Sequence, residues 1–232
     1  IQSMIYNKVC IVGAGAIGGW LGAGLARAGC AVSFLARGET LKALQTQGLK
    51  LQSNAQPEQT HTVRASNNAT ELGVQDLLII AVKAPALREV AQQITPLLGK
   101  DTVVLTAMNG VPWWFLQGFG GSLANQALSS VDATGEIAAA IPVTHIIGGV
   151  VHASCSVASP GVIRHAFGNK IIVGEPSGDL SPRVKALAAL LEKAGFERAA
   201  FAGMGKRTPG EYIAYLQTEL AAIADERAGL ES

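Results

Sequence analysis

The sequence carries little charge and has no long uninterrupted apolar stretch. Charged residues make up 15% of its 232 residues, and 18 Lys and Arg nearly balance 17 Asp and Glu. A net charge of +1 gives no basic surface of the kind that binds nucleic acid or an anionic membrane, so we expect neither partner. No run reaches the roughly 18 apolar residues of a membrane-spanning helix, and we expect no secretory signal at the start.

Cysteine is also scarce. Cys10, Cys30 and Cys155 are spread along the chain without a CxxC pair. This pattern favours buried, reduced thiols over a disulfide framework, so we expect a cytoplasmic protein. The spacing of three histidines, His145, His152 and His165, matches no metal site. We expect structural roles for them and no metal.

Glycine and alanine, in contrast, crowd into one stretch, VGAGAIGGWLGAGLARAG, which runs from Val12 to Gly29. The apolar run NKVCIV before it is typical of a buried parallel strand. Helical spacing of Ile17, Leu21 and Leu25 predicts a helix that ends at Gly29, and the apolar run AVSFLAR predicts a second strand. The order is therefore strand, glycine turn, helix, strand.

In that context Gly13, Gly15 and Gly18 match the pattern G-x-G-x-x-G of a dinucleotide-binding turn. The first glycine permits a tight turn, the second lets the backbone approach a pyrophosphate, and the third lets the helix pack closely on the strand. The alternative is a glycine-rich turn that binds no ligand. The residues expected at the pyrophosphate are Gly13, Ala14, Gly15, Ala16, Ile17 and Gly18.

The end of the second predicted strand bears on the choice of cofactor. NAD sites usually have Asp or Glu there, whereas this chain reads FLARGET and places Arg37 at that position. A guanidinium group suits a 2′-phosphate, so we expect NADP(H) as the cofactor. The alternatives are a solvated surface arginine, or NAD held with the help of Glu39.

The rest of the chain alternates strand and helix patterns, which predicts an α/β fold: a Rossmann-type, doubly wound, mostly parallel sheet. We expect an edge strand at His61–Arg64, an antiparallel extension of three short strands between residues 145 and 176, and a helix capped by Ser181. Lys83 and Asn109 follow two buried strands, at the edge where such sheets bind ligands. Alternatively, Lys83 caps a loop and Asn109 belongs to a turn.

These pieces resemble the ketopantoate reductase (2-dehydropantoate 2-reductase) family. The matching segments are VGAGAIGG, LAR, AVKA, MNGV and GGVVHA…SPGVIRHAFGNKIIVGE, in the family's order. The resemblance implies NADPH-dependent reduction of a branched 2-oxo acid, ketopantoate, to pantoate for pantothenate and coenzyme A synthesis. It implies that Arg37 binds the 2′-phosphate and Lys83 the cofactor. It further implies that Asn109 lies beside nicotinamide and substrate as the catalytic residue, and that Ala153 makes a backbone contact to the cofactor.

The resemblance weakens after residue 200. In the family, a lysine in a Trp-x-Lys helix of a second, helical domain supplies the proton; this chain has no such motif there, and Lys206 is the nearest basic candidate. We expect an NADP-binding Rossmann-type domain at 4–200 and a remnant or incomplete helical substrate domain at 201–232. The apolar face through Ile213, Leu216, Leu220 and Ile223 predicts a homodimer or a missing neighbour. A catalytically silent NADP(H)-binding protein and a reductase of another branched 2-oxo acid remain alternatives.

Overall fold

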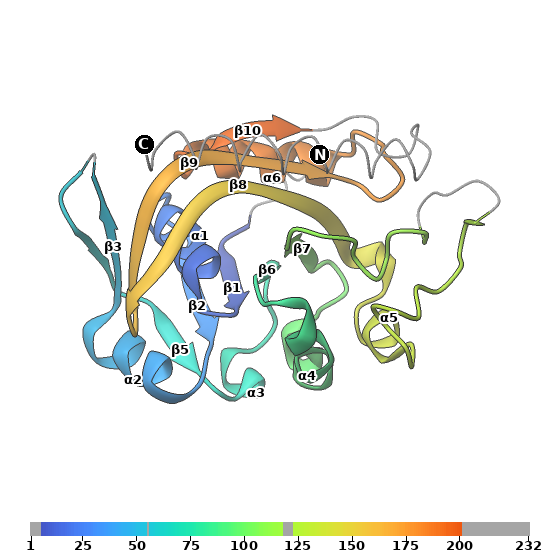
Figure 1. The fold of residues 1–232 in the computed structure, drawn as a ribbon, viewed down its shortest axis with the longest axis horizontal. Helices are drawn as coiled ribbons and strands as arrows, with labels where there is room; N and C mark the ends of the chain where they lie inside the picture. The colour runs from blue at the N-terminus through green and yellow to red at the C-terminus, as the bar shows by residue number, and fades with distance from the viewer. Residues whose placement is uncertain (1–5, 55, 118–122, 201–232) are drawn as a thin grey trace.

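Strands form where the sequence has short apolar runs, and ten of them join in one sheet in the described part of the chain (Figure 1). The computed structural model describes residues 6–54, 56–117 and 123–200. The order along the sheet is β4-β3-β9-β8-β7-β6-β1-β2-β5, and β10 also pairs with β9. The strands are β1 (Lys8–Val12), β2 (Ala31–Leu35), β3 (Leu49–Ser53), β4 (Gln59–His61), β5 (Arg64–Ser66), β6 (Leu77–Ile80), β7 (Val103–Ala107), β8 (Ile146–Ser159), β9 (Val162–Gly174) and β10 (Glu197–Ala200).

Among these strands, β3–β4 and β8–β9 are the antiparallel pairs, and the other pairings are parallel. The predicted Rossmann-type sheet with an antiparallel extension is therefore confirmed. The carboxyl ends of β1, β2, β6 and β7 share one edge because the strands are parallel, so the loops that follow them gather there.

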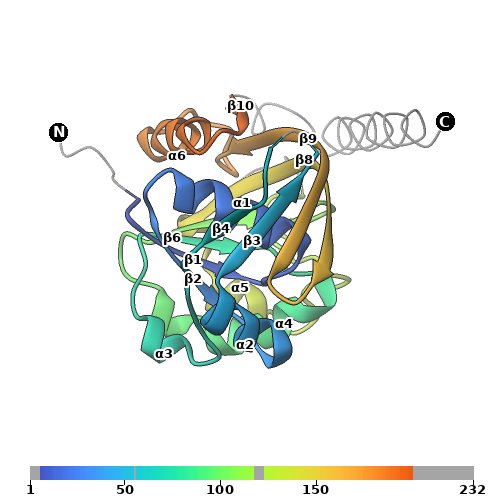
Figure 2. The ribbon, with the colours of Figure 1, turned by 90° about the vertical axis from the view of Figure 1, so that its left-hand side faces the viewer.

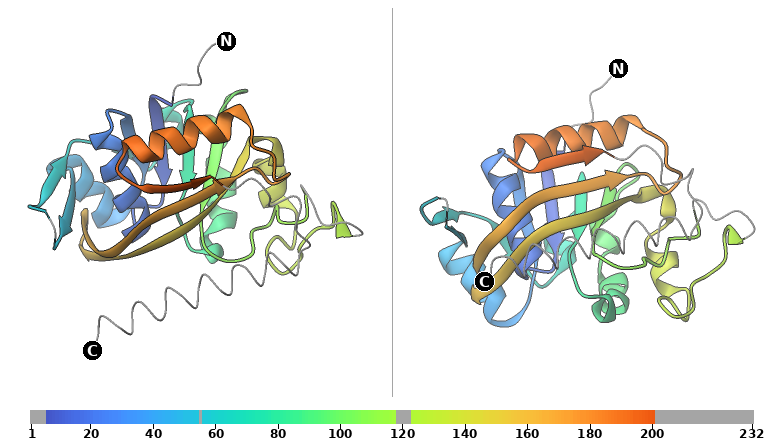
Figure 3. Two further views of the ribbon diagram at one scale, coloured as in Figure 1. Left: turned by 90° about the horizontal axis from the view of Figure 1, so that it is seen from above. Right: turned by 45° about the horizontal axis from the view of Figure 1, so that its top comes forward.

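The antiparallel extension is one long hairpin, not three short strands as predicted. Strands β8 and β9 curve over helix α1 (Ala16–Arg27) as an arch, so that β9 pairs with β10 toward one end and with β3 toward the other (Figures 1 and 3). The Gly168–Asn169 step lies inside β9 and does not reverse the chain. Gly168 has φ of +75°, and the register of the hairpin shifts near it, which is how a strand absorbs an irregular residue without turning.

The predicted edge strand at His61–Arg64 is also wrong. The chain leaves β4 at His61, passes two residues, and enters β5 at Arg64. Strand β4 pairs with β3, whereas β5 pairs with β2 at the opposite end of the sheet order. Residues 59–66 therefore contribute one strand to each end of the sheet. The pairing depends on which neighbouring strand has a free edge and not on the local strand propensity.

Helices cover both faces of the sheet (Figures 1 and 2). Alternation along β1 divides the core: Val9 and Ile11 pack with α1 and α6, whereas Cys10 and Val12 pack with α3, α4 and α5. Both faces are thus apolar, as in a doubly wound fold. The helices are α1 (Ala16–Arg27), α2 (Gly38–Gln47), α3 (Ala69–Leu72), α4 (Leu87–Gln93), α5 (Glu136–Ala140) and α6 (Pro182–Lys193).

The helix ends follow the sequence signals. The Ser181 hydroxyl accepts a hydrogen bond from the backbone amide of Val184, and Gly195 adopts φ of +89° after α6, as its predicted cap and stop require. Gly29 closes α1 in the same way with φ of +94°. Helix α4 is short, because Pro85 and Pro96 lie in 3₁₀ turns on either side of it.

The cysteines are free thiols, as expected, but only Cys10 is buried; Cys30 and Cys155 are half-buried. Burial raises the pKa of Cys10 to about 11 and that of Cys155 to about 12. Within the described ranges, no helix is both long enough and apolar enough to cross a membrane. The predicted helix with Ile213, Leu216, Leu220 and Ile223 lies outside the described residues, as do Lys206 and the whole 201–232 region.

Candidate functional site

The turn between β1 and α1 uses its three glycines for three different physical reasons. Gly13 has φ of +101°, and a Cβ on it would lie 2.7 Å from the carbonyl oxygen of Ala81. A Cβ on Gly18 would lie 1.9 Å from the carbonyl oxygen of Gly13, so the helix rests directly on the turn. A Cβ on Gly15 would meet no atom within 4 Å. Gly15 is therefore the glycine that faces open space, where a ligand would approach.

The open space lies at the N-terminus of α1. Gly15 is the N-cap, its residue type offers no capping side chain, and the first turn of the helix holds no acidic residue. The first amides of a helix have no intrahelical partner, and the helix dipole is positive at this end. These features fit an anion such as a pyrophosphate, so the residues present fit the dinucleotide that the sequence predicts.

A cavity of about 520 Å³ extends from this turn, and we name it the glycine-turn cavity. Its size lies in the range typical of small-molecule sites. It is built from the glycine turn, the end of β2, the start of α2, helix α4 and the outer part of β8. The polar or charged side chains that line it are Arg37, Thr40, Asn67, Glu89 and Gln93, and Val157 contributes from the hairpin.

Arg37 lines the glycine-turn cavity and lies between β2 and α2, which is the chain position that the sequence predicts. Its guanidinium group forms an ion pair with the carboxylate of Glu89 from α4. Both side chains are well exposed, at 76% and 48%. An exposed pair of this kind contributes little to stability, so a ligand can replace it at small cost.

Glu89 was not predicted from the sequence, and 52 residues separate it from Arg37. Thr40 and Asn67 were missed as well. Glu39 is exposed in the first turn of α2 and does not line the cavity. It is the acid that, in the alternative drawn from the sequence, would help to bind NAD. No local pattern marks Glu89, because α4 presents it to the cavity only after the sheet has formed.

Lys83 and Asn109 follow β6 and β7 at the same edge of the sheet, but neither lines the glycine-turn cavity. Lys83 is exposed at the start of a 3₁₀ turn. The side chain of Asn109 is held by β8: its Nδ2 donates to the carbonyl of Val151 at 3.0 Å, and its Oδ1 accepts from the amide of Val151 at 3.1 Å. An amide group retains one further N–H and one further lone pair, so Asn109 can still bind a ligand.

The predicted residues therefore fall into two groups. Gly13, Ala14, Gly15 and Arg37 line one cavity. Lys83, Asn109 and Ala153 form the second group, which does not line that cavity. Ala153 lies in β8, two residues beyond the Val151 that holds Asn109. Ala16, Ile17 and Gly18 form the first turn of α1.

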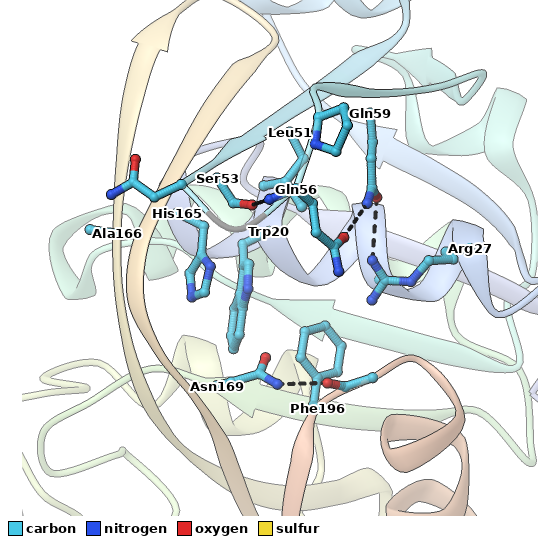
Figure 4. Close-up of a pocket in the computed structure, with 14 residues that line it drawn as sticks. Trp20, Arg27, Leu51, Ser53, Gln56, Gln59, His165, Ala166, Asn169 and Phe196 are labelled. Atoms are coloured by element: carbon cyan, nitrogen blue, oxygen red, sulfur yellow. Dashed lines mark hydrogen bonds between the residues drawn. The ribbon is translucent and has the colours of Figure 1, made fainter.

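A second hollow of about 310 Å³ lies beside the middle and end of α1, and we name it the Trp20 crevice (Figure 4). Trp20 stacks on His165, with ring centroids 5.7 Å apart, and meets the edge of Phe196 at 4.6 Å. Several polar side chains of the crevice pair with one another or with the backbone. Arg27 donates to Gln59 and to the carbonyl of Ala194. Further bonds join Gln59 to Gln56, Asn169 to Gly195, and His165 to Gly168.

The three histidines considered for metal binding make interactions within the structure. His145 Nδ1 lies 2.8 Å from the carbonyl oxygen of Thr102, and His165 Nε2 lies 2.6 Å from that of Gly168. His152 also makes an interaction within the structure. Among the residues with described positions, no group of three or more His, Cys, Asp or Glu side chains is arranged to hold a metal ion.

Comparison with known proteins agrees with this geometry. The family model described as ketopantoate reductase PanE/ApbA matches residues 9–178. A 2-dehydropantoate 2-reductase from Mesorhizobium japonicum is 46% identical over 191 residues, which are 82% of this chain and 58% of that protein.

Solved structures give the same result. A protein from Ralstonia solanacearum MolK2, assigned as a ketopantoate reductase, has a TM-score of 0.83 and 51% identity, with 87% of this chain and 62% of that chain covered. A 2-dehydropantoate 2-reductase from Geobacter metallireducens GS-15 has a TM-score of 0.67 and 29% identity, with 84% and 57% covered. The chain thus spans less than two thirds of the length of each of these relatives.

Proposed function

Because this chain belongs to the ketopantoate reductase (PanE/ApbA) family, we propose that it carries the cofactor-binding part of an NADPH-dependent reductase that converts 2-dehydropantoate to pantoate. The glycine turn and Arg37 carry this proposal together. Gly15 leaves the N-terminus of α1 open to a pyrophosphate, and Arg37 offers a guanidinium group at the end of β2, where a 2′-phosphate is recognised.

Bound NADPH supplies a hydride for the keto carbon of the substrate. In our proposal, the backbone amides of residues 13–18 and the charge of Arg37 fix the cofactor at one end. Lys83 adds positive charge at the sheet edge. Asn109, oriented by its two hydrogen bonds to Val151, presents its remaining N–H toward the reacting region, and the backbone near Ala153 completes that wall. A fixed donor of this kind stabilises charge on oxygen without having to reorganise.

The reaction also needs a proton for the oxygen that was the keto group. Lys206 is the candidate donor that the sequence offers, and it lies outside the described residues. A Lys206→Met variant that keeps its affinity for NADPH but loses turnover would support this assignment; unchanged turnover would remove it.

The proposed reaction is tested by mixing the protein with NADPH and 2-dehydropantoate and following the absorbance of the reduced nicotinamide. We expect Lys83→Ala and Asn109→Ala to lower turnover by at least about tenfold. Lys100→Ala is the matched control, because Lys100 is exposed and lies away from both groups of predicted residues. Failure to bind NADPH in calorimetry would overturn the proposal, and binding of NADPH with no turnover of any branched 2-oxo acid would favour a silent cofactor-binding protein.

We also propose that the protein acts in the cytoplasm as a homodimer. Three free thiols and the absence of disulfides among the described cysteines support a reducing compartment. The apolar face predicted within 201–232 supports a dimer. Sedimentation velocity at several protein concentrations tests the dimer, and a monomer throughout would overturn it.

A further inference from the structure

The glycine-turn cavity contains two opposite charges, and they are bonded to each other. Arg37 and Glu89 are the charged residues among those that line it, and they meet from α2 and α4. A neutralised Arg37 is a weaker anchor for a phosphate than a free one. Glu89 therefore affects any ligand that uses Arg37.

Arg37 and Glu89 act on the same part of a bound ligand because their side chains are in contact. Because the Glu89 carboxylate contacts the Arg37 guanidinium, a group that binds Arg37 must lie beside that carboxylate or displace it. A 2′-phosphate placed there is repelled by the carboxylate, whereas a free ribose 2′-hydroxyl can donate a hydrogen bond to it. In NAD sites an acid at the end of the second strand accepts that bond. Here the end of the second strand holds Arg37, and the acid comes from α4.

We propose that Glu89 is a specificity-determining residue of this site: it weakens the preference for NADPH over NADH by pairing with Arg37 and by accepting the 2′-hydroxyl of NADH. This inference rests on the proposed dinucleotide site. It adds that the choice of cofactor depends on a pair of residues from two helices and not on Arg37 alone.

The expected size follows from the charges. Two unit charges 4 Å apart in water interact by about 1 kcal/mol, which corresponds to about fivefold in affinity. A phosphate monoester carries more than one negative charge near neutral pH, so we expect Glu89→Gln to raise the affinity ratio of NADPH to NADH by about five- to tenfold. The change should shrink at high ionic strength, because both side chains are exposed.

The test is calorimetric titration of the full chain with NADPH and with NADH, for the unmodified protein and three variants. Glu89→Gln removes the proposed determinant. Glu39→Gln removes the same charge from an exposed position outside the cavity. Glu136→Gln breaks the other exposed arginine pair of this region, with Arg88 of α4, whose members do not line the cavity. We expect only Glu89→Gln to change the ratio.

The outcomes separate the two proposals. If the unmodified protein binds NADPH and Glu89→Gln leaves the ratio unchanged, or shifts both affinities equally, the role of Glu89 is overturned and the dinucleotide site stands. An equal change in Glu39→Gln also overturns it, because general charge would then be the cause. If the unmodified protein binds neither cofactor, the proposed function fails and the role of Glu89 fails with it.

Discussion

Helix α1 borders two hollows that differ in what their polar groups do. At its N-terminus, the glycine-turn cavity offers helix amides, a bare Gly15 and an exposed ion pair. Beside Trp20 and Arg27, farther along the same helix, the Trp20 crevice is lined by stacked rings and by side chains bonded to one another (Figure 4). Hydrogen-bonding capacity that is left open points to a ligand, whereas capacity already used points to packing. The volume of a cavity alone does not distinguish a ligand site from a gap in packing.

The largest expected effect lies in the crevice. Trp20 is 3% exposed and packs against His165 and Phe196. We expect Trp20→Ala to lower the free energy of unfolding by about 3–5 kcal/mol, because it leaves a large cavity in the core. Affinity for NADPH, measured well below the melting temperature, should stay within about twofold. Urea denaturation and calorimetry measure the two quantities, and a tenfold loss of affinity would make the crevice part of the cofactor site.

Within the glycine turn, Gly18 and Gly15 are expected to differ in whether a substitution lowers stability or NADPH affinity. We expect Gly18→Ala to cost at least about 1–3 kcal/mol of unfolding free energy, because its Cβ would overlap the backbone of Gly13. Gly15→Ala meets open space, so its stability should change by less than about 0.5 kcal/mol. Its affinity for NADPH should nevertheless fall by about tenfold or more, since the new methyl group occupies the path of the pyrophosphate.

Stability is measured by urea denaturation and affinity by calorimetry. Gly29→Ala serves as a control for adding a methyl group in open space at the other end of α1, although its φ of +94° adds backbone strain. A Gly15→Ala variant that binds NADPH normally would show that no ligand approaches at this turn.

An effect on NADPH affinity of similar size, with almost none on stability, is expected at Arg37. Removing a charged hydrogen-bonding partner costs about 1.5–3 kcal/mol, so we expect Arg37→Ala to weaken NADPH binding by at least about tenfold. NADH affinity should change by less than about threefold, and the melting temperature should barely move because the ion pair is exposed. Parallel loss of both cofactors would indicate that Arg37 supports the loop and does not bind the 2′-phosphate.

The smallest effect concerns His61, next to the crevice residue Arg27. Burial, and then the charge of Arg27, lower the pKa of His61 below 6.5. A lowered pKa means that the folded state favours the neutral ring of His61. The contribution of His61 to the free energy of unfolding is therefore complete above pH 6.5 and is lost as pH falls through the pKa of the folded state. We expect a His61→Gln variant to lose less stability than the unmodified protein on going from pH 8 to pH 5, measured by thermal unfolding. An identical pH dependence would contradict it.

Much of the fold and part of the site followed from the sequence. Short apolar runs placed β1, β2, β6 and β7, and Ser181 placed the start of α6, because these signals act over a few residues. The glycine spacing likewise predicted the turn, since the positive φ of Gly13 and the close approach of Gly18 to the backbone of Gly13 act within a few residues. The single hairpin β8–β9 and the split between β4 and β5 did not follow, because pairing partners far along the chain decided them.

The sequence by itself determined where a phosphate-binding turn forms and which charge ends the second strand, because backbone conformation and strand ends are set by neighbouring residues. Only the tertiary structure decided that Arg37 meets Glu89 and that Asn109 is held by Val151. These contacts join residues separated by 52 and 42 positions, and they exist because parallel strands bring their following loops to one edge. Local chemistry therefore chose the type of site, and the long-range assembly of the sheet chose which side chains complete it.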